Sequence, residues 1–147
     1  PLPVVQAGPD VQLSDQPIPY QLGPATPAGG TWSATTFNVN TVGMSAWSIN
    51  GQNNPPLTLF RGQTYQFVMQ GTSSVHPFNI NTTNTTGSAN LYNDGVTNNG
   101  ASGTQTLTFV VPTNAPDSLH YNCGNHTSMN GPITIITDEI FSDGFEL

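Results

Sequence analysis

The chain has almost no positive charge. Its 147 residues contain no lysine and one arginine, Arg61, against eight acidic residues, so the formal net charge is −7. Nucleic acids and anionic membrane surfaces are bound through clusters of Lys and Arg. The composition therefore argues against both classes of partner, and Thr, Asn, Ser and Gly supply the polarity instead.

Long hydrophobic runs are also missing. No apolar stretch is long enough to span a membrane, and no basic segment followed by an apolar one resembles a secretion signal. Pro1 cannot be a translation start, so we expect the numbering to begin at a mature or trimmed terminus. The near absence of charge is common in exported proteins, and we expect a periplasmic or extracellular location.

Cysteine occurs once, at Cys123. A single cysteine cannot form an internal disulfide, so the usual argument from disulfides to cellular compartment does not apply. A lone thiol in an exported protein is a liability unless it is buried or bound to a metal. That consideration favours a metal site.

The remaining composition divides the chain into three parts. Residues 1–30 are rich in proline and glycine, and proline denies the backbone donors that a central strand requires. This part is predicted to be an extended arm or an edge strand. Residues 31–137 have the length of one domain with a sizeable core. Residues 138–147 form an acidic tail that holds four of the eight acids.

Apolar residues in the middle part recur with a period of two. Short alternating runs separated by Gly, Pro and Asn predict an antiparallel β-sandwich or barrel. Residues 82–103 form a long polar connection with a possible short strand near Leu91–Tyr92. Trp47, Met44 and Met69 are expected in the core. The alternating positions are Phe37 and Val39, Leu57 and Leu59, Tyr65 and Phe67, Leu107 and Phe109, and Ile133 and Ile135.

Four candidate metal ligands stand out. Cys123, His126 and Met129 lie within seven residues, and His76 ends an earlier apolar strand. A tight loop that returns at Gly131 would bring His126 and Met129 toward Cys123. A thiolate, two imidazoles and a thioether suit a copper ion in a trigonal site with a weak axial ligand.

Each of these residues also has an ordinary structural explanation. A single cysteine is more often a small buried hydrophobe, and methionine is routine core filler. It is the combination of the four residues that favours a metal site. His120 has the opposite strand parity to Cys123, so we expect it to face away from the metal.

From about residue 31 to 137 the chain resembles the cupredoxins, the small blue copper proteins. The Cys-x2-His-x2-Met loop at Cys123, His126 and Met129 is similar in spacing to that of amicyanin, a member of that family, and His76 completes the pattern. The resemblance implies a Greek-key β-sandwich and one copper ion in a type 1 site. It also implies one-electron transfer, with redox partners docking transiently near His126.

Two features depart from the family pattern. Pro77 follows His76 where relatives usually have Asn or Ser, and proline offers no N–H to the cysteine sulfur. We therefore hypothesise a lower reduction potential than in close relatives. Gly124-Asn125 stands inside the ligand loop where some relatives have proline, which predicts a looser loop.

Two other functions are compatible with the same residues. A protein that buffers or delivers copper would use the same ligands, and the domain could be a module of a larger redox assembly. An enzyme is not expected, because no Ser-His-Asp arrangement, phosphate-binding glycine loop or close carboxylate pair occurs outside the tail. A copper ion with four protein ligands also has no open position for a substrate.

Overall fold

The computed structural model describes residues 33–138, and these form two β-sheets. The four-stranded sheet has the order β5 (Leu57–Phe60), β11 (Asn130–Ile136), β10 (Ser118–Cys123) and β7 (Phe78–Asn81). The six-stranded sheet has the order β4 (Gln52–Asn53), β3 (Ala46–Ile49), β2 (Thr35–Val42), β6 (Thr64–Met69), β9 (Thr106–Val110) and β8 (Val96–Thr97). The predicted arm over residues 1–30 lies outside the described residues, as does the tail beyond Asp138. Nothing in the described part forms a helix of the length and apolar character needed to span a bilayer.

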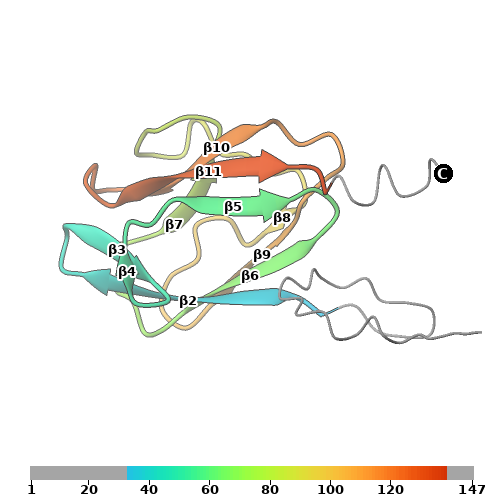
Figure 1. Ribbon diagram of the computed structural model, residues 1–147. Coiled ribbons are helices and arrows are strands. Elements are labelled where there is room, and N and C mark those ends of the chain that lie inside the picture. The colour runs from blue at the N-terminus through green and yellow to red at the C-terminus, as the bar shows by residue number, and fades with distance from the viewer. Residues whose placement is uncertain (1–32, 139–147) are drawn as a thin grey trace, which may run out of the picture. The chain divides into compact units, whose positions relative to one another are not determined.

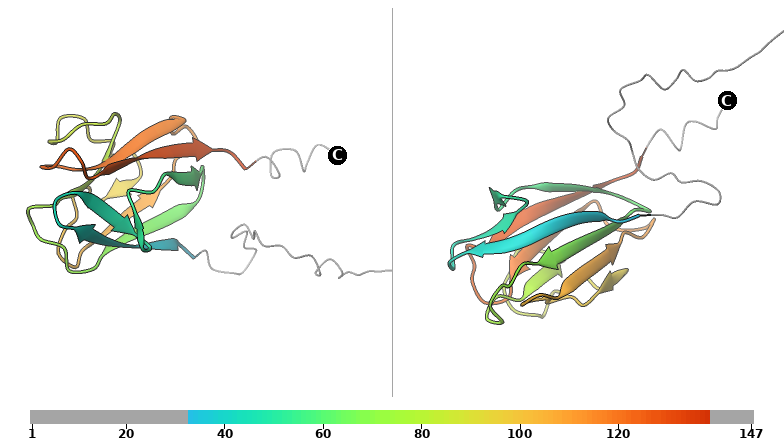
Figure 2. Two further views of the ribbon diagram at one scale, coloured as in Figure 1. Left: turned by 60° about the vertical axis from the view of Figure 1, so that its left-hand side comes forward. Right: turned by 90° about the horizontal axis from the view of Figure 1, so that it is seen from below.

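The two sheets face each other as the layers of a sandwich, as Figures 1 and 2 show. The predicted all-β sandwich is therefore confirmed. It differs from a purely antiparallel arrangement by one parallel pair in each sheet, β5 with β11 and β2 with β6. These partners are far apart in sequence, so the connections between them are long enough to let both strands run in the same direction.

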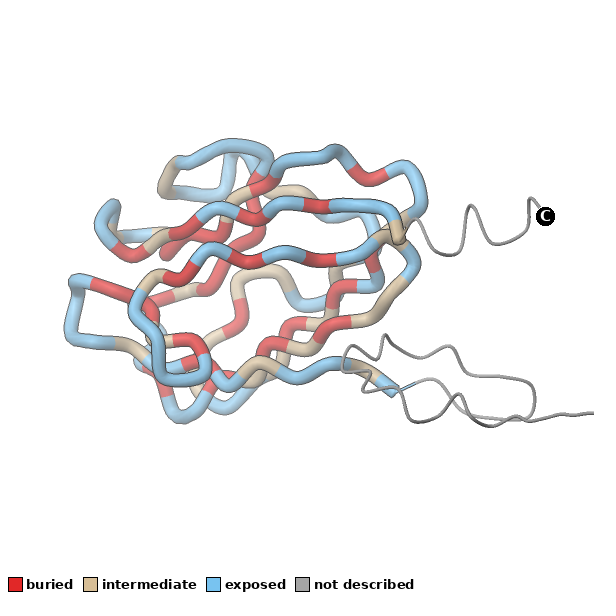
Figure 3. Tube along the Cα trace, in the orientation of Figure 1, coloured by how far each residue is buried: buried red, intermediate tan, exposed pale blue. Residues whose placement is uncertain are grey.

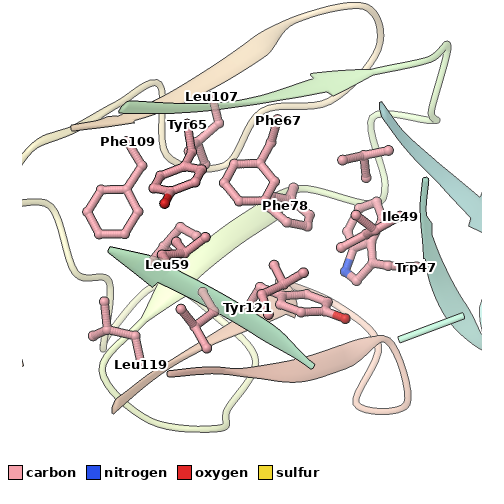
Figure 4. Packing of buried hydrophobic residues seen from close by; sticks show 14 of the residues in the cluster. Trp47, Ile49, Leu59, Tyr65, Phe67, Phe78, Leu107, Phe109, Leu119 and Tyr121 are labelled. Carbon is pink, nitrogen blue, oxygen red and sulfur yellow. The ribbon is translucent and has the colours of Figure 1, made fainter. Parts of the chain in front are cut away.

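The core lies between the sheets and follows the predicted alternation. In β6, for example, Tyr65, Phe67 and Met69 are buried while the residues between them are partly exposed, and Figure 3 shows a similar alternation along β5 and β11. Aromatic rings fill the middle of the sandwich (Figure 4): the Phe78 ring lies 4.9 Å from Trp47 and 5.2 Å from Phe67, centroid to centroid. Offset and edge-on ring pairs of this kind add to the stabilisation from buried area.

One predicted core residue lies on the surface. Met44 is 63% exposed, whereas Met69 and Trp47 are buried as predicted. Met44 occupies the turn between β2 and β3, just after Gly43, which has a positive φ of 54°. The turn carries the chain away from the core, so the alternation that ends at Val42 does not extend to Met44.

The long polar connection covers the outer side of β7. All four residues of β7 are buried, because the segment after it folds back through bonds such as Tyr92 N–H to the Ile80 carbonyl, at 2.8 Å. The strand expected near Leu91–Tyr92 is a single bridge between Leu91 and Asn81, and the short strand β8 follows it at Val96–Thr97. Asparagine side chains supply much of the hydrogen bonding in this cover. Asn99 Nδ2 alone donates to the carbonyls of Ile80 and Tyr92.

Tyr121 fixes the pairing of β10 with β11. Its hydroxyl donates to the buried carbonyl of Pro55 at 2.6 Å, and burial raises the pKa of this phenol well above its usual range. Its ring lies over Gly131, the residue paired with it in β11. A β-carbon at position 131 would collide with the ring and its hydroxyl. Glycine at this position therefore leaves room for the ring.

The first prediction concerns this contact. Gly131→Ala should destabilise the protein by about 1–3 kcal/mol, since a methyl group would be forced into a filled space. Thr134→Ala, at an exposed position of the same strand, should cost less than about 1 kcal/mol. Chemical unfolding of the three proteins measures both values, and equal stabilities would contradict the role assigned to Gly131.

Candidate metal centre

Strand pairing brings the predicted ligands to one end of the four-stranded sheet. Cys123 is the last residue of β10 and pairs with Phe78, the first residue of β7. His76 precedes Phe78 by two residues and so lies beside the end of β10. Past Cys123 the chain enters the ligand loop, residues 124–129, which returns to begin β11 at Asn130.

Backbone hydrogen bonds close the ligand loop tightly. The Cys123 N–H donates to the Met129 carbonyl at 2.9 Å, and the Met129 N–H donates to the His126 carbonyl at 3.2 Å. These bonds turn the loop back on itself within six residues. The loop therefore carries the His126 ring toward the sulfur.

Three of the four predicted ligands meet. The Cys123 Sγ lies 3.7 Å from Nδ1 of His76 and 3.5 Å from Nδ1 of His126, and the three donor atoms all lie within 4.8 Å of one another. An ion bonded to sulfur at about 2.3 Å and to nitrogen at about 2.0 Å in a trigonal plane separates those atoms by about 3.7 Å. The three donors therefore fit a trigonal site, and one thiolate with two imidazoles is the donor set that suits copper.

Met129 lies in the same loop. It is fully buried and belongs to the hydrophobic core. Its role as the axial ligand stays a prediction. His120 does not join the three grouped donors; it contacts Oδ1 of Asn130 at 3.0 Å.

The site is shielded from water on its inner side. Cys123 is fully buried and His76 is 6% exposed, whereas His126 is only partly buried. The edge of the Trp47 ring faces the His76 ring at 6.4 Å between centroids. His126 is therefore the candidate ligand nearest to solvent.

Burial also favours the form of His76 that binds metals. Loss of hydration disfavours its imidazolium ion and lowers the pKa of His76, and repulsion from the nearby His126 lowers it further. A lowered pKa keeps the ring neutral near pH 7, and neutral imidazole is the metal-binding form.

Sequence reasoning missed the contacts around Asn125. Its backbone N–H lies 3.4 Å from the Cys123 sulfur, and its side-chain Nδ2 donates to the Val75 carbonyl at 2.8 Å. These two bonds hold the part of the loop, Gly124-Asn125, for which the absence of proline predicts more freedom. No local pattern points to a contact between residues fifty positions apart.

The second prediction concerns the metal-free protein. The pKa of His76 is lower in the folded chain than the value of about 6.5 expected after unfolding. The unfolded chain therefore binds more protons, and stability should fall as the pH decreases below about 6.5. His76→Gln should flatten this part of the stability curve, which urea unfolding at several pH values measures. A slope that is unchanged in the variant would contradict the assignment to His76.

The comparisons with known proteins find only similar solved structures. No protein-family model matches the sequence, and no curated protein matches it. Among solved structures, the chain is similar to the copper protein rusticyanin, with a TM-score of 0.49, 18% identity, and coverage of 71% of this chain and 80% of that one. Reduced rusticyanin gives a TM-score of 0.47 at 18% identity, covering 71% and 81%. Rusticyanin from Thiobacillus ferrooxidans gives 0.45 at 17% identity, covering 71% and 79%.

Proposed function

We propose that this chain is a mononuclear type 1 copper protein of the cupredoxin class that carries single electrons. The observation that carries the proposal is the meeting of one thiol and two imidazole nitrogens, 3.5 and 3.7 Å from the sulfur, at a buried end of the sandwich. We propose His76, Cys123 and His126 as the trigonal ligands and Met129 as the axial one. We also propose that the protein works in the periplasm or outside the cell.

The chain's own residues suit this role because strand pairing and burial hold them in place. A bound copper ion would supply a one-electron change between Cu(I) and Cu(II), which thiolate and imidazole ligands both tolerate. The strand pairing of Cys123 fixes the sulfur, and burial fixes the ring of His76. A site whose donors stay in place requires little rearrangement when the charge on the ion changes.

We propose that redox partners dock around His126. Val75 is 52% exposed and Met44 63% exposed, and hydrogen bonds connect both to the ligand loop, through Asn125 and Ser128 respectively. The segments 41–47, 72–79 and 120–130 contain no Asp, Glu, Lys or Arg. Docking should therefore be weak, transient and only modestly sensitive to salt.

The same burial supports a carrier over a protein that delivers copper. Delivery requires an acceptor's ligands to reach the ion and replace the donor's ligands one by one. Cys123 and His76 are buried, so an acceptor would have access only from the side of His126. Electron transfer through the His126 ring needs no such access. If the four proposed ligands fill the site, no open position is left for a substrate, which supports a carrier over an enzyme.

The third prediction tests the proposed metal directly. Copper(II) added to the metal-free protein should produce an intense thiolate-to-copper absorption band in the visible region. Cys123→Ser should abolish the band, whereas His120→Asn should retain it, since His120 contacts Asn130 rather than the grouped donors. Visible and EPR spectra measure this, and a spectrum typical of ordinary nitrogen and oxygen ligands would contradict the proposal.

The fourth prediction concerns Pro77. A hydrogen bond to a charged group contributes about 1.5–3 kcal/mol, and proline cannot donate one. Pro77→Asn should add an N–H where the resemblance to cupredoxins implies a donor to the sulfur, and so weaken the electron donation of the sulfur and raise the reduction potential. Pro116→Ala, at an exposed proline before β10, should leave the potential unchanged. Redox titration measures both, and an unaltered potential in Pro77→Asn would refute the idea.

A further inference from the structure

Asn125 makes two different hydrogen bonds, one within the ligand loop region and one to the segment that carries His76. Its backbone N–H points to the Cys123 sulfur at 3.4 Å. Its side-chain Nδ2 donates to the carbonyl of Val75, the residue before His76, at 2.8 Å. A single exposed residue thus connects the segment that carries one candidate ligand with the loop that carries the others.

The Val75 carbonyl gives the side-chain bond a specific chemical role. Its oxygen lies 4.0 Å from the Cys123 sulfur, where a protonated thiol could donate weakly to it. Cysteine binds metals as the thiolate, which has no proton to donate, so the carbonyl oxygen would then lie near a negative sulfur. The Asn125 Nδ2 group remains as a donor to that oxygen, while the Asn125 N–H remains as a donor to the sulfur.

Other side-chain bonds tie the same loop to a different part of the fold, whereas a backbone bond from the Gly124 N–H to the Pro77 carbonyl, at 3.0 Å, also joins it to the His76 segment. The Ser128 hydroxyl donates to the Met44 carbonyl at 2.9 Å, and Asn54 Nδ2 donates to the Ser128 carbonyl at 3.0 Å. Those bonds hold the loop against the β2–β3 turn and the residue after β4. The Asn125 side chain instead reaches the His76 segment, where Pro77 offers no N–H of its own.

We propose that Asn125 is a positioning residue that clamps the His76 segment to the ligand loop beside the Cys123 sulfur. Through this clamp it sets how tightly the ion is held and at what potential it is reduced. The proposal rests on the proposed copper site and adds to it a residue that is not itself a ligand.

Two variants separate the parts of the clamp. Asn125→Ala removes the side-chain bond and keeps the backbone N–H. Asn125→Asp keeps the size of the side chain, but its carboxylate cannot donate and repels the Val75 carbonyl. Asn125 is exposed, so both variants should fold. Ser128→Ala is the matched control, because it also removes one side-chain bond from the exposed part of this loop.

Copper release to a chelator gives the main measurement. The loss of one hydrogen bond, worth about 1 kcal/mol, should make release about fivefold faster in Asn125→Ala, and more than that in Asn125→Asp. Ser128→Ala should stay within about twofold of the unaltered protein. The reduction potential should fall in Asn125→Ala, because a less firmly held N–H stabilises the thiolate less, and should stay constant in Ser128→Ala.

Hydrogen exchange of the metal-free protein gives a second, copper-independent measurement. The amide of residue 125 should lose protection in Asn125→Ala and keep it in Ser128→Ala. Release, potential and exchange that match the unaltered protein would overturn the clamp while leaving the copper site intact. Equal effects from Ser128→Ala would show that any side-chain bond of this loop has the same influence, and would also overturn the proposal. If the unaltered chain binds no copper with a thiolate band, the proposed function itself fails.

Discussion

The pairing of β10 with its two neighbours is the constraint on which the rest of the site depends. Tyr121 pairs with Gly131 on one side and with Ile80 on the other, and two residues later Cys123 pairs with Phe78. A shift of one residue in either pairing would turn the Cys123 side chain away from the core. The space over Gly131 and the hydrogen bond of the Tyr121 hydroxyl to Pro55 both favour the observed register.

This register brings distant parts of the chain together and leaves the ligand loop little freedom. His76 precedes β7, the strand partner of Cys123. His126 lies in a loop that is closed by one bond from Cys123 to Met129 and one from Met129 to His126. Side-chain bonds from Asn125 and Ser128 then fix the loop to two separate segments. The strand pairing and the bonds that close the loop therefore hold the three donor atoms in place.

The sequence predicts the features that depend on neighbouring residues, but it does not predict contacts between segments that are far apart in the chain. Period-two alternation identifies strands such as β6, because apolar residues at every second position give the strand one face that is buried in the core. The spacing of Cys123 and His126 likewise predicts that both belong to one loop. The parallel pairs and the cover over β7 depend on contacts between distant segments. The surface position of Met44 depends on the turn at Gly43, which ends the alternation of β2. The hydrogen bond from Asn125 to Val75 also could not be predicted, since neither residue alone differs from an ordinary loop residue.

The two departures from the family pattern form a single structural feature. The Pro77 carbonyl accepts a hydrogen bond from the Gly124 N–H at 3.0 Å, and a β-carbon at position 124 would lie 2.8 Å from the Pro77 ring. Glycine after the cysteine therefore makes room for proline after the first histidine. Since Pro77 cannot donate to the sulfur, the donor found there belongs to Asn125, the residue after Gly124. Pro77, which has no N–H, thus packs beside a loop whose own residue 125 donates to the sulfur.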